Sequence, residues 1–85
     1  MSYHLQPIPT GQYGDISKIE EELLELKDAQ EQGIKIMELN ELSDLIGAIE
    51  GYLDKHHPGL TLDDLIAMKK ATRRAFESGH RKPKV

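Results

Sequence analysis

The feature that most constrains the fold is a pair of long segments with helical periodicity, separated by a short break that contains a glycine. In residues 16–32 and 35–56, apolar residues recur every three or four positions, and no stretch alternates apolar and polar residues as a strand would. Gly33 stands between the segments, where glycine commonly ends a helix, and Pro58 follows the second. We therefore predict two long helices joined by a tight turn, which places them antiparallel.

Local signals predict where the helices begin and indicate a third one. Ser17 and Glu20 have the spacing of a capping box and Asp15 is an alternative N-cap, so the first helix should begin between Asp15 and Ser17. Thr61 is expected to cap a third helix that ends near Ser78. The fold class is therefore all-α, an antiparallel helical hairpin plus a third helix.

The size of the chain makes self-association an expectation. With 85 residues, of which 38% are hydrophobic, one domain covering residues 1–85 can build only a marginal core. Residues 1–15 contain two prolines and two glycines and predict an irregular N-terminal arm, and residues 79–85 predict a flexible basic tail. We expect a homodimer or homotetramer that completes the three helices into a helical bundle.

Composition excludes several classes of protein. The chain contains no cysteine, which excludes a disulfide framework and a thiolate zinc site. It has no apolar run long enough to span a bilayer and no basic, apolar leader, so a cytoplasmic protein without a membrane partner is expected. The net charge of −4 argues against a nucleic-acid partner, although the end of the chain is basic.

Each long helix carries one pair of acids, three residues apart, beside its apolar stripe. The first stripe consists of Ile16, Ile19, Leu23 and Leu26, and Glu22 and Glu25 lie at its edge. The second stripe consists of Leu39, Leu42, Leu45, Ile46, Ile49 and Leu53. Glu41 and Asp44 belong to a neighbouring row that is otherwise apolar or small: Met37, Glu41, Asp44, Ala48 and Tyr52. The phase of Asp28, Glu31 and Glu38 assigns them to solvent.

Antiparallel packing can bring the two acid pairs together. Four carboxylates at close range repel one another unless a cation joins them. A set of oxygen ligands favours a hard cation, so Mg²⁺ is the first expectation and Mn²⁺ is possible. The alternative is that acids at this spacing only line solvated helix faces, and the geometry of the sequence leaves both interpretations open.

The same residues resemble a known family. Glu22-Leu23-Leu24-Glu25 is E-x-x-E and Glu41-Leu42-Ser43-Asp44 is E-x-x-D, with fifteen residues between them. This pattern resembles the signature of the MazG-like nucleotide pyrophosphohydrolases of the all-α NTP pyrophosphatase superfamily, over roughly residues 17–79. The resemblance implies Mg²⁺-dependent hydrolysis of a (deoxy)nucleoside triphosphate to the monophosphate and pyrophosphate by a homo-oligomer.

The resemblance also implies roles for the acids. Glu22, Glu25, Glu41 and Asp44 would be the metal ligands, and Glu22 or Glu25 would accept the proton of the attacking water. Glu21 opens the E-E-x-x-E form of the motif and could position water, although its phase points it away from the ligand face.

Basic residues are candidates for binding the phosphates. Lys69 and Arg73 lie at the edge of the apolar stripe of the third helix, Arg81 lies in the tail, and Lys18 shares the side of Glu22 and Glu25. That third stripe consists of Leu62, Leu65, Met68, Thr72 and Phe76. The alternatives are that Lys69 lays its stem over the core, that Arg73 pairs with an acid, and that Lys18 only moderates the acidic cluster.

Other features keep further interpretations open. Gly47 and Gly51 share a face that would allow close helix approach across a subunit interface or toward a nucleotide. The residues available to stack on a base are Tyr3, His4, Tyr13 and Tyr52. The rival functions are a non-enzymatic helical oligomer that binds a partner protein and a nucleic-acid binder that uses the basic third helix.

Overall fold

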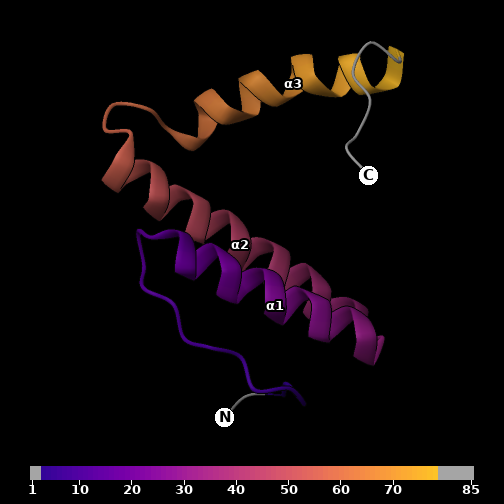
Figure 1. Ribbon diagram of the computed structural model, residues 1–85. Helices are drawn as coiled ribbons and strands as arrows, with labels where there is room; N and C mark the ends of the chain where they lie inside the picture. The colour runs from indigo at the N-terminus through magenta and orange to yellow at the C-terminus, as the bar shows by residue number, and fades with distance from the viewer. Residues whose placement is uncertain (1–2, 79–85) are drawn as a thin grey trace.

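The computed structural model describes residues 3–78 of the chain, and they form three helices. Helix α1 spans Ile16–Gln32, α2 spans Lys35–His56 and α3 spans Leu62–Ser78 (Figure 1). No strand occurs among these residues, so the prediction of an all-α chain is confirmed for the described part. None of the three helices is both long and apolar enough to cross a membrane.

The helix ends follow the sequence signals with one exception. Gly33 adopts a left-handed conformation (φ 72°) and its N–H closes the last turn of α1. Thr61 caps α3 as predicted, since its hydroxyl accepts from the N–H of Asp64 at 3.4 Å and its own N–H donates to the Asp64 carboxylate at 2.8 Å. The capping box predicted at Ser17 is wrong. Its hydroxyl instead accepts from the Gln12 N–H at 3.0 Å, which ties the arm to the start of α1.

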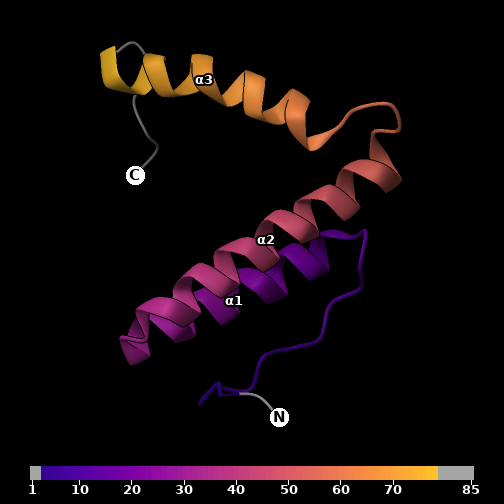
Figure 2. The same cartoon turned by 180° about the vertical axis from the view of Figure 1, so that it is seen from behind.

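Helices α1 and α2 lie side by side and the N-terminal arm runs back along α1 (Figures 1 and 2). Two hydrogen bonds attach the arm at different positions along α1: Gly11 N–H donates to Glu21 at 2.7 Å and Leu5 N–H donates to Asp28 at 3.3 Å. The start of α1 is also tied to the far end of α2 by an ion pair between Asp15 and Lys55 at 2.5 Å. The arm is therefore an ordered third layer over the two helices.

The stripes predicted to form the core of the chain are largely exposed. Leu23 is 48% exposed, Leu39 63% and Ile46 48%. Acids and small residues occupy the buried positions instead: Glu22, Asp28, Ala29, Glu41, Ala48 and Gly51, together with Leu53. The leucine stripes are therefore only partly covered within one chain, because two helices share only one face and here that face carries the acids and receives the arm.

Helix α3 extends away from the other two (Figures 1 and 2). It contacts α2 sparingly and makes no contact with α1 among the described residues. None of its residues is buried, and Met68 and Phe76 of its predicted stripe are 64% and 48% exposed. The apolar side of α3 therefore finds little cover within this chain.

Gly11 offers a direct test of how the arm is attached. A Cβ at this position would lie 2.2 Å from the carbonyl oxygen of Ser17, which belongs to the first turn of α1 and cannot yield without opening the helix. We expect Gly11→Ala to release the arm, measured as faster amide hydrogen exchange of residues 5–12.

The control is Gly47→Ala in α2, where a Cβ would meet nothing within 4 Å. This variant should keep the arm protected and stabilise the fold by about 0.5–1 kcal/mol, because alanine replaces glycine inside a helix. Equal arm protection in the two variants would contradict the attachment described above.

Candidate metal centre

The structure brings together the four acids that the sequence singles out. Glu22 and Glu25 project from α1 and Glu41 and Asp44 from α2, and each offers a carboxylate oxygen within 4.8 Å of the others. The two acids of each pair lie on successive turns of the same face of their helix. The packing of α1 against α2 therefore brings the two pairs close together. Glu22 and Glu41 are buried, Glu25 is partly exposed and Asp44 is exposed. The cluster is therefore closed on one side and reachable from the other.

The electrostatics of the cluster are strained in the absence of added positive charge. Burial, a hydrogen bond with Glu22 and the charge of Glu41 raise the pKa of Glu25 to about 7. One oxygen of Glu22, Oε2, is buried and has no hydrogen-bond partner among the described residues. A buried carboxylate oxygen without a partner is costly. Four converging carboxylates, one of which carries such an atom, fit a hard divalent cation, whose charge would offset both penalties.

Lys18 supplies the nearest positive charge on α1. Its Nζ lies 3.2 Å from Oε1 of Glu21 and 3.3 Å from Oε1 of Glu22. Burial alone would lower the pKa of Lys18, but the hydrogen bonds to these two carboxylates outweigh it and the pKa is raised. In this conformation Lys18 is a counter-ion of the acids, which is the second of the two roles that its position in the sequence allowed.

Glu21 lies at the margin of the cluster and holds the arm. It accepts the Gly11 N–H, and this hydrogen bond is the main cause of its lowered pKa, with Lys18 contributing further. Glu21 is not part of the group of four whose oxygens converge. The helical phase that pointed it away from the ligand face agrees with this position.

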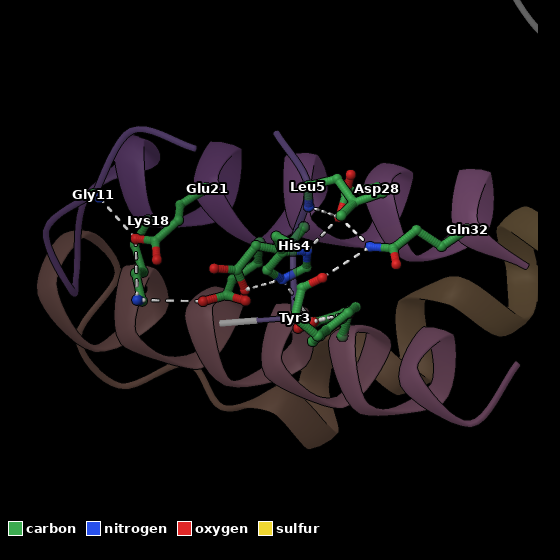
Figure 3. A network of polar contacts seen from close by, with 11 residues as sticks. Tyr3, His4, Leu5, Gly11, Lys18, Glu21, Asp28 and Gln32 are labelled. Atoms are coloured by element: carbon green, nitrogen blue, oxygen red, sulfur yellow. Dashed lines mark hydrogen bonds and ion pairs between the residues drawn. The ribbon is translucent and has the colours of Figure 1, made fainter. Parts of the chain in front are cut away.

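The arm places two residues over the cluster that the sequence analysis considered only for base stacking. The Tyr3 hydroxyl donates to Oε2 of Glu41 at 2.5 Å, and Nε2 of His4 lies 3.2 Å from the same oxygen and 4.0 Å from Oε2 of Glu25 (Figure 3). Burial and the bond to Glu41 raise the pKa of the Tyr3 hydroxyl above its usual range. Helical periodicity carries no information about the path of an irregular arm, so no signal in the sequence placed these side chains on the acids.

Asp28 was assigned to solvent, and that prediction is wrong. It is 4% exposed and accepts three hydrogen bonds: from the His4 ring at Nδ1 (2.8 Å), from Leu5 N–H (3.3 Å) and from Gln32 Nε2 (2.8 Å) (Figure 3). Burial alone would raise the pKa of Asp28, but these hydrogen bonds outweigh it and the pKa is lowered. Asp28 therefore fastens the arm as an ionised acceptor. Helical phase could not predict this role, because it describes how side chains face another helix and does not include contacts with an irregular arm.

The candidate phosphate-binding residues of α3 do not reach the acids within one chain. Lys69 and Arg73 are exposed on a helix that has no contact with α1, and Arg73 pairs with Glu77 at 2.8 Å, as one of the alternatives anticipated. Lys69 was expected at the edge of a buried stripe, but that side of α3 has little cover. Arg81 lies outside the described residues. Of the three predicted basic residues that the structure describes, Lys18 is the one that stands beside the carboxylates.

Comparison of the chain with protein-family models, with curated proteins and with solved structures found no match. The geometry of the cluster and the chemistry of its residues are therefore the grounds on which a function can be proposed.

The raised pKa of Glu25 predicts how stability depends on pH. Between its ordinary value of 4.5 and its folded value of about 7, the folded state binds a proton that the unfolded state has lost. In a chelating buffer, we expect the contribution of Glu25 to the free energy of unfolding to fall as pH rises through this window. Urea titrations at pH 4.5, 6 and 8 measure it.

Glu25→Gln should remove this pH-dependent loss of stability. The free energy of unfolding of the variant, relative to that of the wild type, should therefore increase with pH. The exposed residue Glu50 provides the control, because Glu50→Gln leaves the cluster intact. A pH dependence that is the same in wild type and Glu25→Gln would contradict the proposed crowding of carboxylates.

Proposed function

We propose that the chain is a divalent-cation-dependent nucleoside triphosphate pyrophosphohydrolase that converts a (deoxy)nucleoside triphosphate to the monophosphate and pyrophosphate. The observation that carries the proposal is the convergence of four carboxylates, one of which, Glu22, has a buried oxygen that lacks a hydrogen-bond partner among the described residues. The resemblance of the two acidic motifs to those of MazG-like enzymes supplies the reaction. The oxygen donor set favours Mg²⁺, with Mn²⁺ as the alternative.

In this proposal all four carboxylates bind the cation, and one of them also acts as the base. Glu22, Glu25, Glu41 and Asp44 would hold the cation, and the burial of Glu22 and Glu41 excludes competing water from its inner side. The chemistry that the cation supplies when bound is neutralisation of phosphate charge and acidification of a water molecule. Of the two candidate bases, Glu25 suits the role better, since one oxygen of Glu22 is held by Lys18 and Glu25 is partly exposed.

The phosphate-binding residues would come from α3 of a second copy of the chain. Lys69 and Arg73 stand on a helix that extends away from its own carboxylates, so a partner is the simplest source of cationic side chains near the cluster, with Arg81 as a further candidate. Developing negative charge on the leaving pyrophosphate needs such groups, because phosphoryl transfer depends mainly on positioning and electrostatic stabilisation. We propose a homodimer or homotetramer as the active species.

Activity measurements test the reaction. We expect purified protein with Mg²⁺ to release pyrophosphate from one or more members of a panel of NTPs and dNTPs. Glu41→Gln and Glu22→Gln should each lower the rate by more than about 100-fold, since loss of outer-shell partners of a metal site alone costs about 10–100-fold. The exposed Glu50→Gln on α2 is the matched control and should leave the rate unchanged.

An equal loss of the rate of pyrophosphate release in Glu41→Gln and Glu50→Gln would contradict the assignment of the four acids as the active site. Absence of cation-dependent pyrophosphate release from every nucleotide would favour the second candidate, a helical module that binds a partner protein. That candidate draws on the exposed apolar residues of α2 and α3. The basic surface of α3 also suits a nucleic acid, but the net charge of −4 weighs against it.

The assembly can be tested independently of the reaction. We expect wild-type protein to sediment at a multiple of its 9.6 kDa chain mass, because association would cover the exposed apolar residues. Ile46→Lys places a charge on the exposed apolar face of α2 and should shift the equilibrium toward the single chain. The control, Glu50→Lys, introduces the same side chain at an exposed polar position and should not. A wild-type protein that sediments as one chain would contradict the proposal.

A further inference from the structure

We propose that His4 of the N-terminal arm is a ligand of the same centre, and that its Nε2 atom makes the site select a transition ion such as Mn²⁺ or Co²⁺ over Mg²⁺. This inference rests on the proposed cation site but concerns a residue outside the acidic motifs. His4, Glu25 and Glu41 form a second group of donors whose atoms lie within 4.8 Å of one another, and this group shares Glu25 and Glu41 with the group of four carboxylates.

The distances fit ligands of one ion. Two donor atoms that each lie about 2.1 Å from an ion are about 3.0 Å apart at a right angle and at most about 4.2 Å apart when opposite. Nε2 of His4 lies 3.2 Å from Oε2 of Glu41 and 4.0 Å from Oε2 of Glu25, and both separations fall within this range. The buried, unpartnered Oε2 of Glu22 shows independently that the cluster is short of positive charge among the described residues.

The other nitrogen of the ring is already oriented. Oδ2 of Asp28 also accepts from Leu5 N–H and from Gln32 Nε2, so it is an acceptor, and Nδ1 of His4 carries the hydrogen of the 2.8 Å contact between them. In a neutral imidazole this leaves the lone pair on Nε2, which lies 4.0 Å from Oε2 of Glu25 and 3.2 Å from Oε2 of Glu41. A carboxylate that orients a histidine through its distal nitrogen is the usual outer shell of a histidine ligand.

The backbone on both sides of His4 is held in place. The carbonyl oxygen of Tyr3 accepts from Gln32 at 3.2 Å, and the N–H of Leu5 donates to Asp28. The His4 side chain is 8% exposed, and an open groove of about 320 Å³ between the arm and α1 is lined by His4 and Glu25. The imidazole is therefore fixed at the cluster while solvent can reach it.

A nitrogen donor changes the class of ion that the centre prefers. Carboxylates alone suit Mg²⁺ and Mn²⁺, whereas imidazole adds affinity for Mn²⁺, Co²⁺ and Zn²⁺ and little for Mg²⁺. The arm would then set ion selectivity, a property that the acidic motifs of α1 and α2 cannot supply by themselves.

The test uses the full chain and ions without nucleotide. Pulsed electron paramagnetic resonance of bound Mn²⁺ should show coupling to a directly bound nitrogen in wild type and none in His4→Ala. Calorimetric titrations should show His4→Ala weakening Co²⁺ binding by about tenfold or more while Mg²⁺ binding changes by less than about twofold. Asp28→Asn, which removes the orienting acceptor, should weaken Co²⁺ binding in the same direction, and His57→Ala at the exposed end of α2 should have no effect.

Two results would overturn the inference. Tighter binding of every ion by His4→Ala would show that the arm competes with the ion, and unchanged Co²⁺ binding with no nitrogen coupling would show that His4 has no part in the site. Glu41→Gln separates this failure from that of the proposed function. If Glu41→Gln weakens ion binding and His4→Ala does not, this inference alone is contradicted. If bound Mn²⁺ shows nitrogen coupling but the protein hydrolyses no nucleotide, the proposed function alone is contradicted.

Discussion

The structure depends on a helix interface that is built from carboxylates rather than leucines. Glu22 and Glu41 are buried where α1 meets α2, and their charges repel unless something positive stands between them. Within the chain, Lys18 places a positive charge beside Glu22, and the Tyr3 hydroxyl of the arm donates a hydrogen bond to Glu41. The ordered course of the arm is thus a consequence of the acids beneath it, and so is the raised pKa of Glu25.

The same choice of interface explains why so much apolar surface is left outside. Because the acids use the face that α1 and α2 share, residues such as Leu39 and Ile46 of α2 are exposed, and α3 contacts α2 too sparingly to cover them. A chain of this size cannot leave that area open without losing much of its hydrophobic stabilisation. The polar inner face and the apolar outer face of α1 and α2 therefore have one cause, and the homo-oligomer proposed above would cover the apolar face.

Periodicity predicted the parts of this structure that repeat along a helix. The helix bounds, the turn at Gly33 and the convergence of Glu22, Glu25, Glu41 and Asp44 follow from a period of 3.6 residues and one reversal of direction. What periodicity could not supply was the arm, because irregular backbone has no repeat. The burial of Asp28 and the contacts of His4 depend on that arm and were missed for the same reason. The position of α3 also could not be predicted from the sequence, since an apolar stripe does not indicate which surface packs against it.

Coupling between the arm and the centre follows from the shared atom at their junction. Oε2 of Glu41 accepts from Tyr3 and faces Nε2 of His4, so any ion that engages this oxygen changes what holds the first residues of the arm. The contacts of Glu21 with Gly11 and of Asp28 with Leu5 do not involve that atom and would keep the arm in place meanwhile. The arm is thus also anchored away from Glu41, so an ion at the proposed centre would need to adjust only Tyr3 and His4 and would not bear the cost of ordering a free segment.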